Sequence, residues 1–478
     1  MTRSGCIFGI FFLHFIGQGC VPSTQRGHLQ LDDLPAQLAL GINKEQPEPP
    51  KNEVEKNCDK LLEPWWNHWN DDLNARLLIL RQNNLKLLNQ DQQLEILRLQ
   101  ANIVGASGQP EIFGTAKWTE TQVGGKQSTD KSTHSPTLGF LASWELDLWG
   151  KLKSQRETAR LKVEWSEWQR HQLQLSLEAE LVKTWVRTIA LSEDRLLLQR
   201  QLAEQKKLLD STEARFRQGL STAQECWQQR ETTFALQKNF APLEPRQQVL
   251  EQALQILMGS DLRQAPTSLL LDKLPPLNEP FPETLPSQVL ANHPKVKMAW
   301  NKLLQADENV VQKITQRWPT LSLSGSLLLT ATQPEDVFQN WINQLTANLL
   351  MPLFDAGQRK SNVNVAKTQF KIALLEYTEA VRQTYVEICQ ALGQFQQIKK
   401  QLHWLTLEQN ARQEVLKEAE KRYPMGQESA TNVWRFRQSL YQIEREALSL
   451  NAERLISLVA IQQSLGPPPP PQTMPSQE

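Results

Sequence analysis

The chain has little that would support catalysis or metal binding. It holds only five cysteines and six methionines, and Cys58, Cys226 and Cys389 share no spacing typical of a metal site. The low methionine content gives no support for copper or silver handling. The histidines are scattered as well: His68, His134, His171, His293 and His403. No phosphate-binding loop, no serine–histidine–aspartate arrangement and no redox pair is present. We therefore predict no enzymatic activity, no cofactor and no metal.

The chain also lacks an excess of either charge and lacks a long apolar run. Lysine plus arginine and aspartate plus glutamate number 52 each, so no overall field attracts nucleic acid. No stretch after the N-terminus reaches about 18 apolar residues, which argues against an α-helical inner-membrane protein. Glycine is scarce whereas glutamine, leucine and glutamate are abundant, and this favours long helices over a β-sandwich.

The N-terminus of the chain has the features of an export signal. Arg3 precedes an apolar run over residues 7–16, and small residues then lead to Cys20. This order is typical of a secretory signal, so we assign residues 1–19 to a signal peptide. The glycine–cysteine step resembles the lipidation site of bacterial lipoproteins, although Gly17 stands where leucine is usual. Cys20 is either the lipidated, palmitate-bearing first residue of the mature chain or a free cysteine beside an ordinary cleavage site.

The remainder of the chain contains two copies of one sequence repeat. Gly150 recurs as Gly357, and an arginine–aromatic–x–x–glycine motif at residues 215–219 recurs at residues 422–426, always 207 residues apart. Trp227, Arg230 and the glycine that closes the first copy recur at the same offset. A repeat of this length must be recognised before any other assignment. It indicates one elongated helical hairpin built twice, each copy preceded by a short apolar module.

Composition sets the boundaries between the segments. Proline and charge dominate the stretch before the first repeat, prolines cluster between the repeats, and a proline run ends the chain. We predict a signal peptide at 1–19, a lipid-anchored tether at 20–60, a first repeat at 61–259, a proline-rich crossover at 260–284, a second repeat at 285–466 and a tail at 467–478.

Alternating apolar and polar residues predict two strands in each repeat. The predicted strands cover residues 112–119, 137–149, 320–329 and 341–354, and the polar residues 121–135 are predicted to form a long exposed loop. One apolar face fits either a soluble sheet packed on helices or a transmembrane barrel. Four strands cannot close a barrel, so the second alternative needs several chains. Aromatic residues that would suit an interfacial girdle stand at the helix-proximal strand ends: Phe113, Trp149, Trp318 and Phe354.

Apolar residues at helical spacing predict long helices around these strands. A first helix is predicted from residue 65 to about residue 105, and seams of alternating three- and four-residue spacing run over residues 161–189 and 363–405. No proline interrupts residues 152–218, so a continuous helix there would be roughly 100 Å long. Neighbouring helices must cover the apolar stripe of so long a helix.

Each long helix is followed by a tight reversal. Gly219 and Gly426 can adopt the left-handed conformation that ends a helix. Thr222 and Ser429, three residues later, can cap the next helix, and Thr222 with Glu225 forms a capping-box sequence. A single reversal of this kind is an ordinary hairpin turn, but two matched copies favour a docking surface. The predicted docking residues are Arg215, Gly219, Leu220, Thr222, Arg422, Gly426 and Ser429.

The doubled arrangement resembles the outer membrane factor (TolC-like) family, in particular the lipoprotein branch of efflux proteins. The resemblance covers almost all of the mature chain and rests on four segments. Residues 65–73 resemble the early Trp-Trp motif of the family, residues 141–150 and 351–357 resemble its two strand-to-helix junctions, and residues 285–294 resemble its Leu-Pro-Ser segment with departures.

The resemblance implies a mainly α-helical fold with a small β part. Three chains would close a twelve-stranded outer-membrane β-barrel, and their long coiled-coil hairpins would form a periplasmic α-barrel. The hairpin tips would meet a periplasmic adaptor, or membrane fusion protein, bound to an inner-membrane pump of the RND type. Substrates such as drugs and toxic compounds would leave passively through this duct in the outer membrane. The alternatives are an exit duct for type I protein secretion and a periplasmic coiled-coil scaffold or adaptor.

One departure from the family concerns the closed entrance. Members of the family place aspartates six and nine residues after the second tip glycine, whereas this chain has Asn432 and Arg435 there. A ring of carboxylates concentrates cations, and asparagine and arginine do not. We predict that Asn432 and Arg435 stand at the periplasmic gate, and either the channel prefers cations less than its relatives do or different groups close the gate.

Overall fold

The computed structural model describes residues 66, 69–125, 128–260, 273–275, 290, 292–331 and 338–466, and leaves out the side chains of residues 122–134. The predictions for the signal peptide, for Cys20, for the tether and for the tail all lie outside the described residues. Most of the predicted crossover does so too. These assignments, and the segment boundaries as a whole, stay predictions.

The described residues divide into two units, and the boundaries fall within four helices: α3 (Leu85–Ala106), α4 (Lys151–Arg217), α8 (Pro294–Thr315) and α9 (Gln358–Arg422). The first unit holds Glu95–Trp165 and Ala299–Thr378. The second unit holds the described residues up to Leu94, together with Ser166–Met298 and the residues from Glu379 onward.

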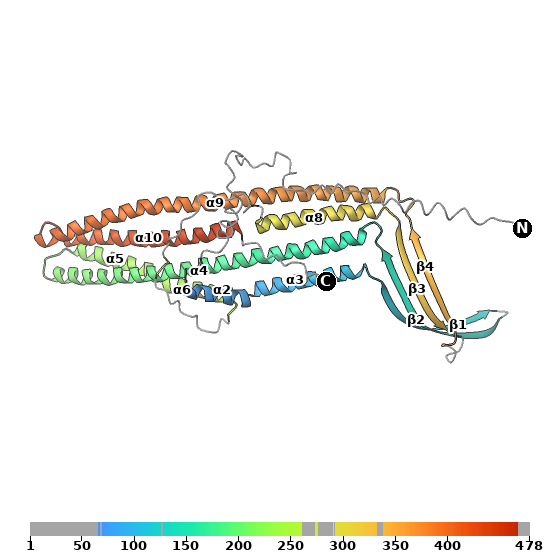
Figure 1. Ribbon diagram of the computed structural model, residues 1–478. Helices are drawn as coiled ribbons and strands as arrows, with labels where there is room; N and C mark the ends of the chain where they lie inside the picture. The colour runs from blue at the N-terminus through green and yellow to red at the C-terminus, as the bar shows by residue number, and fades with distance from the viewer. Residues whose placement is uncertain are drawn as a thin grey trace, which may run out of the picture. The chain divides into compact units, whose positions relative to one another are not determined.

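The first unit contains an antiparallel sheet of four strands in the order β1-β2-β3-β4 (Figure 1). The strands are β1 (Glu111–Gly125), β2 (Ser128–Leu146), β3 (Thr320–Thr330) and β4 (Trp341–Leu350). The predicted contribution of two strands from each repeat is confirmed. The pairing of β2 with β3 joins the two repeats in one sheet.

The register keeps one face of the sheet apolar. Trp144 lies opposite Leu323, and one residue earlier Ser143 lies opposite Ser324. Because successive side chains point to opposite faces, apolar residues meet apolar residues across the strands on one side and hydroxyl groups meet on the other. The period-two alternation in the sequence therefore describes the faces of the sheet correctly.

The predicted loop at residues 121–135 is wrong. Strands β1 and β2 continue through it, with Val123 opposite Lys131 and Gly125 opposite Ser128. Val123 is the one large apolar residue of the segment, so no apolar alternation marks it in the sequence. Backbone hydrogen bonds between adjacent strands need no apolar side chain, and the pairing continues on them.

Two strands end earlier than predicted. Strand β2 stops at Leu146, because the Asp147 carboxylate accepts a 2.7 Å hydrogen bond from the backbone N–H of Lys153 and so caps the start of α4. Strand β4 stops at Leu350, shortly before Pro352, which has no backbone N–H to donate to a neighbouring strand.

Four helical segments accompany the sheet in the order of its strands. They are α3 (Leu85–Ala106), the first part of α4, α8 (Pro294–Thr315) and the first part of α9. The Ser154 hydroxyl on α4 donates a 2.5 Å hydrogen bond to the Glu308 carboxylate on α8. On the other side of α8, the amide of Asn309 donates to Gln369 on α9 over 3.2 Å. The helices therefore form one layer, like the strands.

The single helix predicted over residues 65–105 is two helices, α2 (Asp71–Asn83) and α3. They separate at Asn84, whose backbone is extended. The Asn84 side-chain oxygen accepts hydrogen bonds from the N–H groups of Lys86 and Leu87, which caps α3, and its amide donates to the Leu257 carbonyl over 2.7 Å. A polar residue inside a leucine stripe thus ends one helix and starts the next.

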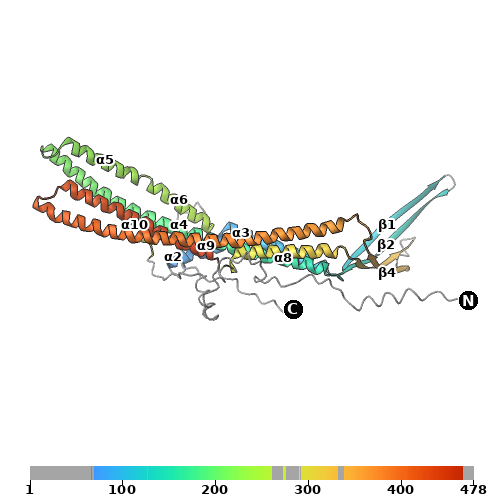
Figure 2. The ribbon, with the colours of Figure 1, turned by 90° about the horizontal axis from the view of Figure 1, so that it is seen from above.

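The second unit contains two long hairpins (Figure 2). The predicted continuous helix is confirmed as α4, and it returns as α5 (Ala223–Phe240) and α6 (Leu243–Met258), with Pro242 at the break between them. Helix α9 passes through a short 3-10 turn, η5 (Tyr423–Met425), and returns as the unbroken α10 (Ala430–Leu465).

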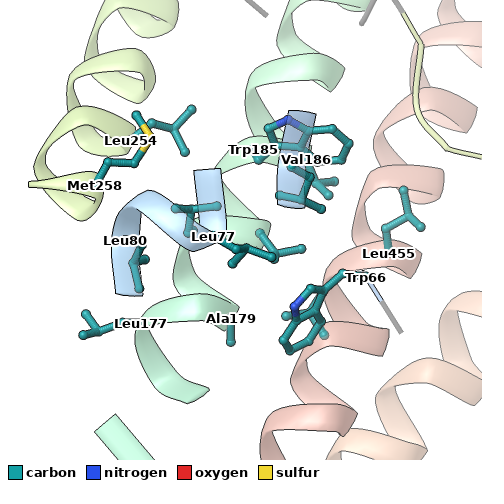
Figure 3. Packing of buried hydrophobic residues seen from close by; sticks show 14 of the residues in the cluster. Trp66, Leu77, Leu80, Leu177, Ala179, Trp185, Val186, Leu254, Met258 and Leu455 are labelled. Atoms are coloured by element: carbon teal, nitrogen blue, oxygen red, sulfur yellow. The ribbon is translucent and has the colours of Figure 1, made fainter. Parts of the chain in front are cut away.

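The main core of this unit lies where α2, α4, α6 and α10 meet (Figure 3). Trp185 and Val186 on α4 are fully buried, and Leu77 on α2 and Leu254 on α6 are almost completely so. Two smaller clusters extend this core along the hairpins. The seam predicted for α4 is the part of the helix that packs here.

Candidate functional site

The first reversal closes with the hydrogen bonds of a Schellman motif. Gly219 has a φ of +75°, which only glycine adopts without strain. Its N–H donates to the Phe216 carbonyl over 2.9 Å, and the N–H of Leu220 donates to the Arg215 carbonyl over 2.9 Å. These bonds satisfy two carbonyl groups at the end of α4.

The second reversal is built in the same way. Gly426 has a φ of +72° and its N–H donates to the Tyr423 carbonyl over 3.0 Å. The N–H of Gln427 donates to the Arg422 carbonyl over 3.2 Å. Pro424 converts the last turn to a 3-10 helix without changing this pattern. The matching glycines found in the sequence therefore mark two reversals of one geometry.

The start of the returning helix differs between the two copies. In the first, the Thr222 hydroxyl accepts the N–H of Glu225 and the Glu225 carboxylate accepts the N–H of Thr222, both over 3.2 Å, which is the predicted capping box. In the second, the Ser429 hydroxyl accepts the N–H of Asn432 over 3.1 Å. Here Glu428 supplies the carboxylate, which accepts the Ser429 N–H over 3.1 Å and the Asn432 amide over 2.7 Å.

Both carboxylates are held in the charged form. The Ser221 hydroxyl and the Thr222 N–H lower the pKa of Glu225, with a smaller contribution from the charge of Arg215. The Asn432 amide and the Ser429 N–H lower the pKa of Glu428, and Arg422 and Arg435 add to this. Each reversal therefore presents an exposed arginine beside an ionised carboxylate.

Exposed apolar side chains stand between these charges. Leu220 and Met425 are 65% and 70% exposed, and Phe216 and Tyr423 are about half exposed. Apolar groups left open beside arginines are typical of protein-binding surfaces. Of the four, only Leu220 is among the predicted docking residues. Phe216, Tyr423 and Met425 lie inside the repeated motif. The aromatic position of that motif could have pointed to Phe216 and Tyr423.

Ion pairs repeat below the tips. Arg230 on α5 pairs with Glu213 on α4 over 2.8 Å, and their counterparts 207 residues later, Arg437 on α10 and Glu420 on α9, pair in the same way. Each hairpin is therefore tied across its own two arms. Only the arginines stood out in the sequence, because the partner glutamates lie in a stretch rich in charge.

A further ion pair ties the two hairpins together. Arg445 on α10 donates two hydrogen bonds, of 2.5 and 2.9 Å, to the Asp194 carboxylate on α4. Charge-assisted bidentate bonds of this kind fix orientation as well as distance. Nothing in the periodicity of either helix predicted this pair.

The two predicted gate residues lie one turn apart at the start of α10. The Asn432 amide is already engaged by Glu428, and Arg435 is exposed. Among the described residues no group of histidine, cysteine, aspartate or glutamate is arranged to hold a metal ion. None of the described helices has the length and apolar character needed to cross a membrane.

A sheet that is apolar on one face, joined to long helices that reverse at matched glycine tips, defines the class of outer-membrane ducts. The sequence comparison is specific. Residues 78–260 and 285–467 each match the Outer membrane efflux protein family, and the second segment begins and ends 207 residues after the first. The chain belongs to this family, and the internal repeat deduced from the sequence is the repeat of its domain.

Individual relatives agree with this assignment. The chain is 27% identical over 412 residues to the pyoverdine export outer membrane protein OpmQ of Pseudomonas putida, which covers 84% of this chain and 87% of that protein. It is 22% identical over 458 residues to the probable outer membrane lipoprotein SilC of Salmonella typhimurium, covering 95% and 96%. The fold matches the CmeC outer membrane channel of Campylobacter jejuni with a TM-score of 0.76 at 20% identity, over 90% of this chain and 91% of that one.

The family assignment confirms several predictions. The protein is an efflux channel of the outer membrane that extends into the periplasm, and it belongs to a family of transport proteins rather than enzymes. The predicted fold class, long helical hairpins with a small sheet and an internal repeat, is confirmed as well. Channels of this kind are the outer-membrane component of tripartite efflux systems. The periplasmic scaffold is thereby excluded as an alternative.

Proposed function

We propose that three copies of the chain form one duct, in which twelve strands close a barrel. Within the described residues, β1 and β4 each pair on one side only, so the sheet has two open edges. Its apolar face is exposed, with Leu345 at 80% and Ile112 at 72%. An open edge and a bare apolar face are costly in water, and closure with further copies inside a lipid bilayer removes both costs.

The outermost helices of the first unit support the same assembly. Helix α3 exposes Leu99 and Ile103, and α9 exposes Ile372 and Leu375. These two helices stand at opposite ends of the helical layer, as β1 and β4 do in the sheet. Contact between α9 of one copy and α3 of the next buries both apolar surfaces.

We infer that the two reversals dock a periplasmic adaptor that is bound to an inner-membrane pump of the RND type. Arg215, Leu220 and Arg422 would contact the adaptor, while Gly219, Gly426 and the capping residues Thr222 and Ser429 hold the backbone in position. The exposed apolar groups beside ionised carboxylates and arginines support this docking surface. Transport is passive, because the pump supplies the energy and the duct supplies the route.

The exported substrate is a small molecule in this proposal. The relatives are named for export of pyoverdine, of cations and of antibiotics, and none of these names refers to a protein. Type I secretion of a protein is therefore the weaker alternative. The observation that best supports the efflux duct is the pair of matched tips. A ring of docking sites for an adaptor requires reversals that share one geometry.

The full chain should complement a Gram-negative host that lacks its own efflux ducts and that expresses a matching adaptor and pump. We expect detergent to extract it from outer membranes as a trimer and the host to regain several-fold resistance to pump substrates. A monomer released by salt washing would contradict the proposal. A trimer that restores protein secretion but no drug resistance would favour the type I alternative.

The gate makes a separate prediction about ion selectivity. In planar bilayers the wild-type channel should show a weak preference for cations, because positions 432 and 435 carry no carboxylate and the nearby Glu428 is hydrogen-bonded to the Asn432 amide. The double variant Asn432→Asp/Arg435→Asp should raise the permeability ratio of potassium to chloride several-fold. Asn364→Asp, an exposed change on α9, should leave the ratio unchanged. Strong cation selectivity of the wild type would refute the assignment of the gate.

A further inference from the structure

A basic groove of about 630 Å³ lies between α3 and α4 in the first unit. Four cationic side chains and one carboxylate line it: Arg98, Lys153, Arg156, Arg160 and Glu157. Small residues of α3 form part of its wall, and no atom lies within 4 Å of where a side chain on Gly105 would begin. The groove is therefore open and carries an excess of positive charge.

Two of the four cations in the groove are not paired with a neighbouring carboxylate among the described residues. Arg160 pairs with Glu157 over 2.7 Å and with Glu164 over 3.2 Å, and so uses the nearest acids. Lys153 and Arg156 are exposed, and neither side chain forms an ion pair with any residue that the structure describes. Two cations are thus available to an external anion.

Gly108 is close both to a groove arginine and to a tryptophan of the apolar face of the sheet. Trp144, which lies on that face opposite Leu323, donates an indole hydrogen bond of 3.1 Å to the Gly108 carbonyl. The Arg156 guanidinium carbon is 3.9 Å from the position that a Cβ on Gly108 would take. Gly108 therefore has an apolar-face tryptophan on one side and a groove arginine on the other.

The groove is also placed at the passage from helix to strand. Helix α3 ends five residues before β1 begins, at Ala106 and Glu111, and α4 begins at Lys151, five residues after β2 ends at Leu146. If the sheet spans the outer membrane, as the proposed function requires, the groove stands at the periplasmic surface of the bilayer. Arginine, lysine and tryptophan at that depth are typical of lipid-facing surfaces.

We propose that this groove binds the phosphate headgroup of an anionic phospholipid from the inner leaflet, while the acyl chains lie along the apolar face beside Trp144. Lysine and arginine donate to phosphate oxygens, and basic pockets beside membrane-spanning elements hold anionic headgroups. The proposal rests on the proposed function only in placing the sheet in the membrane.

The second repeat shows that the groove is not a by-product of the duplicated fold. At the positions of Arg98, Arg156, Glu157 and Arg160 it has Gln305, Val363, Asn364 and Lys367. Val363 is buried, where Arg156 is exposed. The second repeat therefore does not carry the same set of basic residues. The repeat also offers a matched control, since Lys360 and Lys367 are exposed counterparts of Lys153 and Arg160.

Native mass spectrometry of the full-length detergent-extracted protein tests the proposal with added phosphatidylglycerol. Lys153→Gln/Arg156→Gln should weaken lipid binding by about tenfold or more, since each cation near a membrane surface contributes on the order of a fivefold change in affinity. Lys360→Gln/Lys367→Gln removes the same charge from the second repeat and should bind lipid as the wild type does. Arg156→Lys should keep most of the binding.

Two results would overturn the proposal. One is equal phosphatidylglycerol binding by wild type and Lys153→Gln/Arg156→Gln. The other is displacement of the lipid by equal concentrations of glycerol phosphate, which would identify a site for soluble anions. The oligomeric state and drug resistance of the same variant are measured in parallel. An active trimer with unchanged lipid binding refutes the lipid site alone, whereas a wild-type chain that forms no trimer refutes the proposed function.

Discussion

Replacing both tip glycines with valine, as Gly219→Val/Gly426→Val, should abolish drug export while the protein still reaches the outer membrane. Both glycines have φ values near +70°, where an L-residue costs about 1–2 kcal/mol and a β-branched residue costs more. The chain relieves this strain by leaving the left-handed region, which breaks the Schellman bonds. The helices themselves keep their packing, because each reversal lies beyond the buried clusters.

The loss should be measured as a fall in drug resistance to the level of the empty host, at least tenfold for a good pump substrate, with trimer abundance unchanged on membranes. Each single variant should lie between wild type and the double variant, because one reversal of each pair remains intact. Gly393→Val is the matched control: Gly393 lies inside α9, is exposed and has no atom within 4 Å of its Cβ position. Valine is a better helix former than glycine, so this variant should export normally. Full export by an abundant double variant would show that the reversals are not the docking surface.

The sequence predicted features that repeat and missed those that depend on single polar contacts. The two reversals were predictable because glycine and a capping hydroxyl have strong local preferences, and because each occurs twice. The break at Asn84 was not, since an asparagine within a leucine stripe is tolerated in many helices. Its decisive bond reaches the Leu257 carbonyl, 173 residues away. Contacts over such separations leave no local pattern.

The polar strands show a different limit of prediction. Apolar alternation identified the part of β2 after residue 136, where one face is apolar, and missed the polar part before it. The pairing of Val123 with Lys131 depends on backbone groups, which every residue carries. Periodicity therefore reports how a strand is buried rather than how long it is. Periodicity also does not report which polar side chains meet. The ion pair between Arg445 and Asp194, which joins the two hairpins, was therefore not predicted.

The two tips also show how a duplicated structure can diverge without losing its shape. The first copy caps its returning helix with Glu225 and the second replaces that residue with Asn432 and draws a carboxylate from Glu428. The backbone N–H of the capping residue is satisfied in both. Because Glu428 supplies the capping carboxylate, residue 432 does not have to be charged for the helix to be capped. We expect the entrance to differ from its relatives at this position for that reason, while the reversal that presents it is preserved.

Trp185→Ala should have the largest effect on stability, a loss of about 3–5 kcal/mol in the free energy of unfolding. The indole is fully buried in the core of the second unit, where α2, α4, α6 and α10 meet (Figure 3). Its removal takes a large apolar surface out of contact and leaves a cavity that rigid helices cannot fill. Trp185→Phe should cost less, because the ring is partly retained and the indole N–H, which has no hydrogen-bond partner among the described residues, is removed.

The measurement is guanidinium unfolding of the purified protein followed by far-ultraviolet circular dichroism, which does not depend on the deleted fluorophore. Trp227→Ala is the matched control, since Trp227 is 65% exposed and contacts the Arg230 guanidinium at 5.0 Å from its ring centre. That contact contributes about 0.5–1 kcal/mol, so the two alanine variants should differ by several kcal/mol. Because the core ties both hairpins to each other and to α2, Trp185→Ala should also lower the amount of trimer in the membrane. Equal stability of the two variants would mean that the hairpins hold together through their ion pairs rather than through this core.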